Sequence, residues 1–178
     1  MNSRNRSLLY AAALARSVGV GMSGVLVGLY AAELGLGAAG VGAVVSVGLL
    51  GVTLGTLGVT LLAERLGRVR CLIALTVVSA LGTAGFALAN APWILAPAAA
   101  LGMVNGMGRD RGAAFSLEQA ILPDTADVRD RTKVFAWYNV VLDLGHALGA
   151  LAGMLPALLR GGGMDALASY RAGFLCVA

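Results

Sequence analysis

The sequence is poor in charge: only 12% of its 178 residues are Asp, Glu, Lys or Arg, about half of the ~25% in an average soluble domain. A chain with so few charges cannot cover a water-facing surface, which excludes an ordinary soluble protein. Cysteine is scarce as well, because only Cys71 and Cys176 are present. Their separation in the sequence matches neither a metal-ligand pattern nor a disulfide framework. Protease, kinase and phosphate-loop patterns are missing too, so we expect no enzyme, no catalytic residue, no cofactor and no metal.

Apolar residues and glycine are abundant instead. Hydrophobic residues make up 58% of the chain, and 26 residues are glycine; the mean hydropathy is +0.84. In water so many glycines would weaken helices, whereas in lipid they let helix backbones approach closely. The composition therefore predicts an all-α integral membrane protein.

Six apolar segments follow one another along the chain. A helix needs about 20 residues to cross a ~30 Å hydrocarbon layer, and five segments are long enough: Leu8–Tyr30, Val41–Leu62, Cys71–Ala89, Pro92–Leu122 and Thr132–Leu159. The sixth, Ala168–Ala178, is too short to span, so we expect the chain to end inside a sixth helix. A cleaved signal peptide is not favoured, because the first run is too long and no small-residue cleavage site follows it. We predict one transmembrane bundle over residues 1–178, with five complete helices and a partial sixth.

The basic residues predict the orientation. With a cytoplasmic N-terminus, the inside segments hold Arg4, Arg6, Arg65, Arg68, Arg70, Arg129, Arg131 and Lys133, and the outside segments hold Arg160 and Arg171. Cytoplasmic loops carry an excess of Lys and Arg, so this distribution predicts that the N-terminus lies in the cytoplasm. We expect the protein to be located in the cell membrane. The net charge of +4 does not indicate a nucleic-acid partner, because the arginines cluster between apolar runs.

Polar residues inside the fourth and fifth segments require a reason, because a charge in mid-span costs about 2.5–3.5 kcal/mol on insertion scales. Asn105, Arg109, Gly112 and Ser116 have the spacing of one helix face, and Asn139, Asp143, His146 and Ala150 have it in the next segment. Each helix would then carry one polar stripe. We expect these stripes to line an aqueous cavity that binds substrate or protons, with five candidate residues: Asn105, Arg109, Asn139, Asp143 and His146.

Several alternatives stay open for these charges. In the first alternative, the charges form buried pairs that neutralise one another and have only a structural role. These charges are Arg109, Asp110, Arg111 and Asp143. The fourth helix could instead end before Arg109, which would place the cluster in a cytoplasmic loop. His146 suits a proton relay with Asp143, but a lone histidine is more often a packing residue.

Arg16 interrupts the first span about two turns from its start. Long basic side chains near a helix end can extend to the lipid headgroups, and we favour this position for Arg16 over a role in a cavity.

The segment Thr60–Arg70 lies between the second and third spans and resembles the loop at this place in transporters of the major facilitator superfamily. That pattern is Gly, three residues, Asp, a basic residue, any residue, Gly and a basic cluster. Here Glu64 stands for the acid, Arg65 for the base, Gly67 for the glycine, and Arg68 and Arg70 for the cluster, while Thr60 replaces the leading glycine.

A second similarity lies in the fifth span. The spacing of Gly145, Gly149 and Gly153 is similar to a motif of the family's antiporters, although helix–helix packing explains the same glycines.

The resemblance implies a fold of two six-helix bundles with the substrate bound between them. This chain would be the N-terminal bundle, and the missing C-terminal six-helix half would be its partner. It implies a secondary transporter that moves a small solute by alternating access, with proton coupling left open. The loop residues Glu64, Arg65, Gly67, Arg68 and Arg70 would form a cytoplasmic gate.

The alternative to a transporter is a membrane fragment or scaffold that only binds a partner. The gene downstream of residue 178 would distinguish the two, because a transporter would continue with six further spans. The identity of the substrate, the coupling ion and the direction of transport are left open by the sequence.

Overall fold

The computed structural model describes residues 3–109 and 112–178, and all regular structure in this part of the chain is helical. Its elements are α1 (Ser3–Glu33), α2 (Ala38–Leu66), α3 (Arg68–Leu88), α4 (Pro92–Gly102), α5 (Ala113–Ile121), η1 (Leu122–Thr125), η2 (Val128–Asp130), α6 (Arg131–Ala152), α7 (Leu155–Gly161) and α8 (Ala166–Val177). The all-α class predicted from the composition is confirmed.

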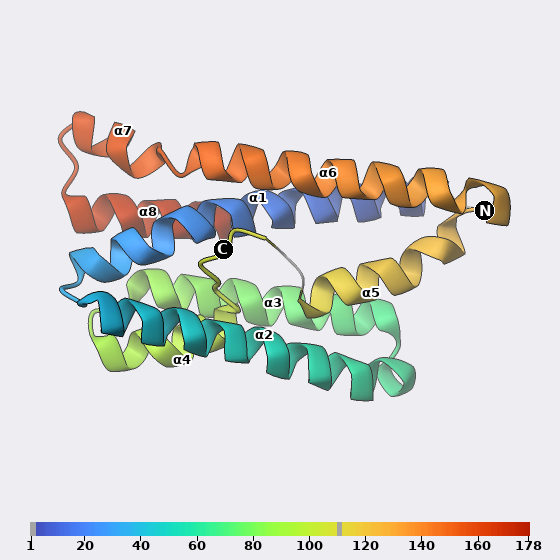
Figure 1. Cartoon of the computed structure of the whole chain (residues 1–178), viewed down its shortest axis with the longest axis horizontal. Helices are drawn as coiled ribbons and strands as arrows, with labels where there is room; N and C mark the ends of the chain where they lie inside the picture. The colour runs from blue at the N-terminus through green and yellow to red at the C-terminus, as the bar shows by residue number, and fades with distance from the viewer. Residues whose placement is uncertain (1–2, 110–111) are drawn as a thin grey trace.

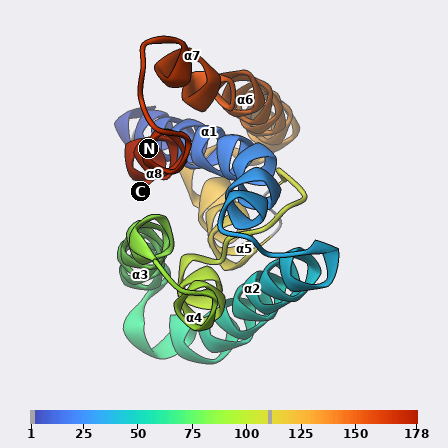
Figure 2. The same cartoon turned by 90° about the vertical axis from the view of Figure 1, so that its left-hand side faces the viewer.

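The helices form two layers that lie along the long axis of the molecule (Figure 1). Seen from the end, α1, α6, α7 and α8 make one layer, α2, α3 and α4 make the other, and α5 lies between them (Figure 2). The main packing partners are α1 with α6 in the first layer, and α4 with both α2 and α3 in the second.

In the described residues, 4 stretches of helix are long and apolar enough to cross a membrane: Asn5–Glu33, Ala38–Leu66, Arg68–Leu88 and Val128–Gly161. They correspond to the predicted first, second, third and fifth spans. The predicted sixth segment begins at α8, where the Asp165 side chain accepts hydrogen bonds from the backbone N–H groups of Leu167 (3.0 Å) and Ala168 (3.3 Å).

The fourth predicted span, Pro92–Leu122, is wrong as a continuous helix. The observed helix α4 ends at Gly102, because Met103 adopts a left-handed conformation (φ 50°). The N–H of Val104 donates a hydrogen bond back to the Ala99 carbonyl at 3.0 Å. This is a usual way to close a helix, although glycine normally occupies the left-handed position. The chain becomes helical again only at Ala113, so the predicted stripe from residue 105 to 116 does not lie on one helix.

Glycines hold the helices of each layer close together. A Cβ atom at Gly149 of α6 would overlap the Val18 carbonyl of α1, and one at Gly51 of α2 would overlap the Ala100 carbonyl of α4. Small residues permit such backbone approach in membrane bundles. Packing therefore accounts for Gly149, one of the glycines whose spacing is similar to the antiporter motif.

An aromatic core joins α1, α3 and α8. Tyr30, Phe86 and Phe174 are fully buried, and the ring centroids of Phe86 and Phe174 lie 5.1 Å apart in an edge-on contact. The Tyr30 hydroxyl donates a hydrogen bond to the Ala87 carbonyl at 2.8 Å, which satisfies it in an otherwise apolar site. This core anchors α8 although the helix is short.

The start of α1, the α2–α3 turn and the η1–η2 segment lie at the same end of the bundle (Figure 1). An ion pair joins two of them, because the Arg68 guanidinium at the turn lies 3.8 Å from the Asp124 carboxylate of η1. The segments predicted to be cytoplasmic therefore share one end. Which side of the membrane that end faces stays a prediction.

Candidate functional site

A buried ion pair lies between the two layers. The Arg16 guanidinium of α1 donates through Nη2 to Oε2 of Glu118 on α5. The Tyr138 hydroxyl of α6 donates to the same carboxylate oxygen at 2.6 Å. Glu118 is only 1% exposed and Tyr138 is fully buried, so this carboxylate joins three helices inside the bundle.

This pair corrects the interpretation of Arg16. Its side chain is 17% exposed and contacts Glu118, so the extension to the headgroups that we favoured is wrong. Removing one partner of a buried pair typically costs about 3–5 kcal/mol, because the other charge stays behind without compensation. Arg16 and Glu118 therefore hold α1 and α5 together, and any ligand that replaces Arg16 on the carboxylate would loosen them.

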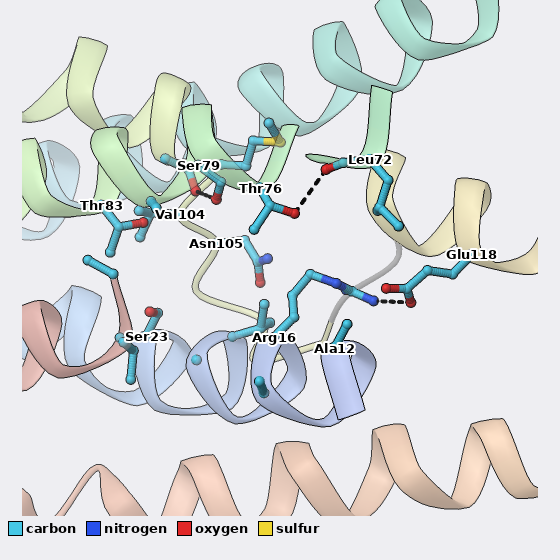
Figure 3. Close-up of a pocket in the computed structure, with 18 residues that line it drawn as sticks. Ala12, Arg16, Ser23, Leu72, Thr76, Ser79, Thr83, Val104, Asn105 and Glu118 are labelled. Atoms are coloured by element: carbon cyan, nitrogen blue, oxygen red, sulfur yellow. Dashed lines mark hydrogen bonds and ion pairs between the residues drawn. The ribbon is translucent and has the colours of Figure 1, made fainter. Parts of the chain in front are cut away.

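The pair forms part of the wall of a cavity of about 340 Å³. The cavity lies between α1 and α3, and its lining includes Arg16, Thr76, Ser79, Asn105 and Glu118 (Figure 3). The Ser79 hydroxyl donates to the Gly102 carbonyl at 2.9 Å, a group that the end of α4 leaves without a helical partner. The cavity thus offers one charged pair and several neutral oxygen atoms.

A second cavity of about 390 Å³ shares the Arg16, Thr76, Ser79 and Asn105 side of the first, and Arg109 belongs to its lining. The Asn105 side-chain oxygen accepts a hydrogen bond from the backbone N–H of Met107 at 3.1 Å. Asn105 and Arg109, two of the residues that were predicted to line a cavity, therefore belong to cavity walls. The break between α4 and α5 places them there, whereas the sequence suggested a helix face. Asp110 and Arg111 lie outside the described residues.

The predicted residues of α6 lie elsewhere. Asn139 and Asp143 are exposed, whereas Tyr138 and Leu142 on the neighbouring face of α6 are buried against α1. Neither belongs to the lining of the two cavities.

His146 is half-buried, and its backbone carbonyl packs against Gly21 of α1. Within the described part of the chain, Arg109 and Asp143 do not approach to the 4.0 Å of an ion pair. The structure thus does not form the direct pair considered from the sequence.

The α2–α3 turn contains the predicted gate residues. Gly67 has φ +91°, a conformation that glycine adopts without a steric penalty. Arg68 links the turn to the rest of the chain: besides the hydrogen bond that it donates to the Ala120 carbonyl at 2.7 Å, it lies 3.8 Å from the Asp124 carboxylate. Glu64, Arg65 and Arg70 are exposed and border a shallow hollow beside Asp124.

Four residues of the site were not predicted from the sequence: Glu118, Tyr138, and Thr76 and Ser79 of α3. A signal existed for Glu118, because it is an acid within the predicted fourth span and Arg16 is a base within the first. Charges inside spans usually pair with one another. Tyr138 gave no comparable signal, since a tyrosine in an apolar helix is common.

In the described residues, the pair and the two cavities offer the Glu118 carboxylate, the guanidinium groups of Arg16 and Arg109, the Tyr138 phenol and neutral oxygens. Among residues 3–109 and 112–178, no three His, Cys, Asp or Glu side chains come together as a metal site. A single carboxylate beside neutral oxygens suits a proton or a hard, singly charged cation, because hard cations prefer oxygen ligands.

Comparison with known proteins identifies a family and a curated relative. The sequence model of the family described as "Major Facilitator Superfamily" matches residues 9–178. A curated relative, the "Na(+), Li(+), K(+)/H(+) antiporter" of Planococcus maritimus, is 30% identical over 91 residues. That alignment covers 51% of this chain and 22% of the antiporter, so the chain is compared with only a small part of that protein.

Proposed function

The chain belongs to the major facilitator superfamily, and we propose that it is the N-terminal bundle of a secondary active transporter. It is an integral membrane protein. In the proposed mechanism it moves a small solute by alternating access, together with a second six-helix bundle. The solute we propose is a monovalent cation exchanged for a proton, and the printed activity of the Planococcus maritimus relative supports this class.

The observation that carries the proposal is the buried carboxylate of Glu118 at a cavity between the layers. Ionisable groups inside membrane bundles usually mark a path for an ion or a substrate. In the described state Arg16 occupies this carboxylate as an internal cation. A proton or an alkali cation that binds Glu118 would replace it, with Thr76 and Asn105 as nearby sources of neutral oxygen.

Replacement of Arg16 would also change the helix packing. Glu118 ties α1, α5 and α6 through its bonds to Arg16 and Tyr138, so neutralising the carboxylate weakens the ties among all three. A ligand shifts a conformational equilibrium by its different affinity for the two states. Occupancy of Glu118 therefore couples to the rearrangement that alternating access requires.

The exposed polar face of α6 indicates where the solute path continues. Asn139 and Asp143 are exposed in the middle of a membrane-spanning helix, and a carboxylate that faced lipid there would be costly. We place this face toward the second bundle, where Asp143 and His146 would line the path. Arg109 borders the second cavity and would contact the same path.

The test is cation–proton exchange in everted membrane vesicles from cells that express the complete gene. We expect sodium, lithium or potassium to collapse an acid interior, as reported by acridine orange fluorescence, while choline does not. Glu118→Gln should abolish the exchange, because the variant keeps the shape of the side chain but cannot carry the negative charge.

The matched control is Asp127→Asn, since this carboxylate is exposed and lies outside both cavities and away from the α2–α3 turn. The control should keep the exchange. Vesicles in which alkali cations act no better than choline would refute the proposed solute class, and full exchange by Glu118→Gln would refute the proposed site.

A further inference from the structure

A further hollow is lined mainly by α2 and α3, two helices of the layer opposite to α6 (Figure 2). This groove has a volume of about 570 Å³, and its walls include Leu54, Leu62, Leu75 and Val78. Leu54 is 66% exposed, so the groove is open to the surroundings of the bundle. Nothing in the proposed ion path uses it.

The groove begins where α4 stops. Helix α4 packs between α2 and α3 and ends at Gly102, and Ala100 and Met103 form the inner end of the groove. From Gly51 to Leu66 the groove follows α2 for about 22 Å at 1.5 Å per residue. This exceeds half of a ~30 Å hydrocarbon layer, so the groove can take an acyl chain of one leaflet.

The outer end of the groove carries charge. Arg70 is exposed and belongs to the lining, and within the described residues no carboxylate forms an ion pair with it. Arg65 and Arg68 are exposed beside the same turn, where the neighbouring acids are Glu64 and Asp124. The guanidinium of arginine pairs well with a phosphate group through two parallel hydrogen bonds. The groove therefore joins an apolar channel to a cationic mouth at the membrane surface.

We propose that this groove binds an anionic phospholipid, with one acyl chain between α2 and α3 and the headgroup phosphate on Arg70. The site is distinct from the Glu118 cavity and does not depend on the proposed ion exchange. The bound lipid would complete the packing of α2 and α3 in the half of the bilayer that α4 does not reach. It would also contact the turn that contains Arg68.

The test is native mass spectrometry of the purified chain in detergent with dioleoylphosphatidylglycerol and dioleoylphosphatidylcholine, which share acyl chains. We expect the wild type to retain the anionic lipid about fivefold better, the preference that one arginine supplies at a membrane surface. Arg70→Gln should bind both lipids equally. The matched control Arg129→Gln removes an exposed basic residue at the same end of the bundle but outside the groove, and it should keep the preference.

A second variant tests the acyl chain. A Cβ atom at Gly58 would meet no atom within 4 Å, so Gly58→Leu should fold and fill the groove, and it should lose both lipids. Gly58→Ala, which fills less of the groove, should bind at an intermediate level, and circular dichroism should show unchanged helicity in both variants.

Three results would overturn the proposal: an equal loss of preference in Arg70→Gln and Arg129→Gln, full lipid binding by Gly58→Leu with native helicity, or displacement of the lipid by glycerol phosphate alone. The last result would identify a headgroup site that does not need the groove. A photoreactive phosphatidylglycerol should label α2 and α3 within the groove, whereas labelling confined to α6 or α8 would place the lipid elsewhere.

Discussion

The buried pair of Arg16 and Glu118 allows a quantitative prediction about the stability of the bundle. Arg16→Met and Glu118→Leu each remove one charge and leave the other inside the protein, where Glu118 is only 1% exposed. Each single variant should lose about 3–5 kcal/mol of free energy of unfolding. The double variant replaces the pair with apolar side chains, a change that is often neutral, so its loss should fall below the sum by about 3 kcal/mol or more.

The assay is a double-mutant cycle on the purified chain in detergent micelles, with helicity followed during denaturant unfolding. The chain contains a matched control in Arg68 and Asp124, an ion pair at 3.8 Å whose side chains are 53% and 73% exposed. Exposed pairs couple by at most about 1 kcal/mol. The cycle at Arg68 and Asp124 should therefore give a small coupling energy in the same protein.

The reasoning would be refuted by additive losses at Arg16 and Glu118, or by coupling no larger than in the surface pair. Either result would mean that water or another group compensates each charge when its partner is removed. Tyr138→Phe gives an independent check. It removes one hydrogen bond to a buried carboxylate and should cost about 1.5–3 kcal/mol.

Three further predictions concern the topology, the gate and the helix packing. In intact cells, with both native cysteines replaced, Arg68→Cys should resist an impermeant thiol reagent added outside; labelling would reverse the predicted orientation. In the complete transporter, Glu64→Ala should slow transport with little change in solute binding, because the residue lies in the last turn of α2, away from both cavities; parallel losses of both would contradict the gate assignment. Gly149→Leu should destabilise the α1–α6 contact by about 1–3 kcal/mol, because its Cβ would overlap the Val18 carbonyl. Gly42→Leu, which meets no atom within 4 Å, should be close to neutral, and equal stability of the two variants would refute the packing argument.

The long helices were predictable because apolar runs of sufficient length leave few alternatives in a membrane. Helices α1, α2 and α3 lie close to three predicted spans, Leu8–Tyr30, Val41–Leu62 and Cys71–Ala89. The resemblance based on Thr60–Arg70 is likewise confirmed by the family match. These features depend on local sequence, so no knowledge of the packing was needed.

The break after Gly102 was not the favoured prediction, because apolar residues on both sides of Arg109 suggested one continuous span; a helix end before Arg109 was the alternative. The local signals were Asn105-Gly106 and Gly108, which favour turns. The decisive event is the left-handed conformation of Met103, and methionine is not a residue that predicts one. Glycine at this position would have indicated the helix end directly.

The composition of the site could not be predicted because its members are far apart in sequence. Arg16 and Glu118 are separated by 102 positions, and only the tertiary packing, of α1 against α6 and of α5 against α2 and α3, brings them together. Asn139 and Asp143 do share a helix face with each other, as their spacing predicted. The same spacing cannot show whether that face is turned toward the cavities or away from them.

The most direct test of the account is the binding of a labelled alkali cation to the purified protein across a range of pH. If a proton and the cation share Glu118, acid should weaken cation binding, because a carboxylate must be deprotonated to act as a ligand. Glu118→Gln should lose the binding and its pH dependence together, while Asp127→Asn should behave as the wild type does. Cation binding that does not change with pH, or that survives in Glu118→Gln, would contradict the claim that the buried carboxylate is the ion site.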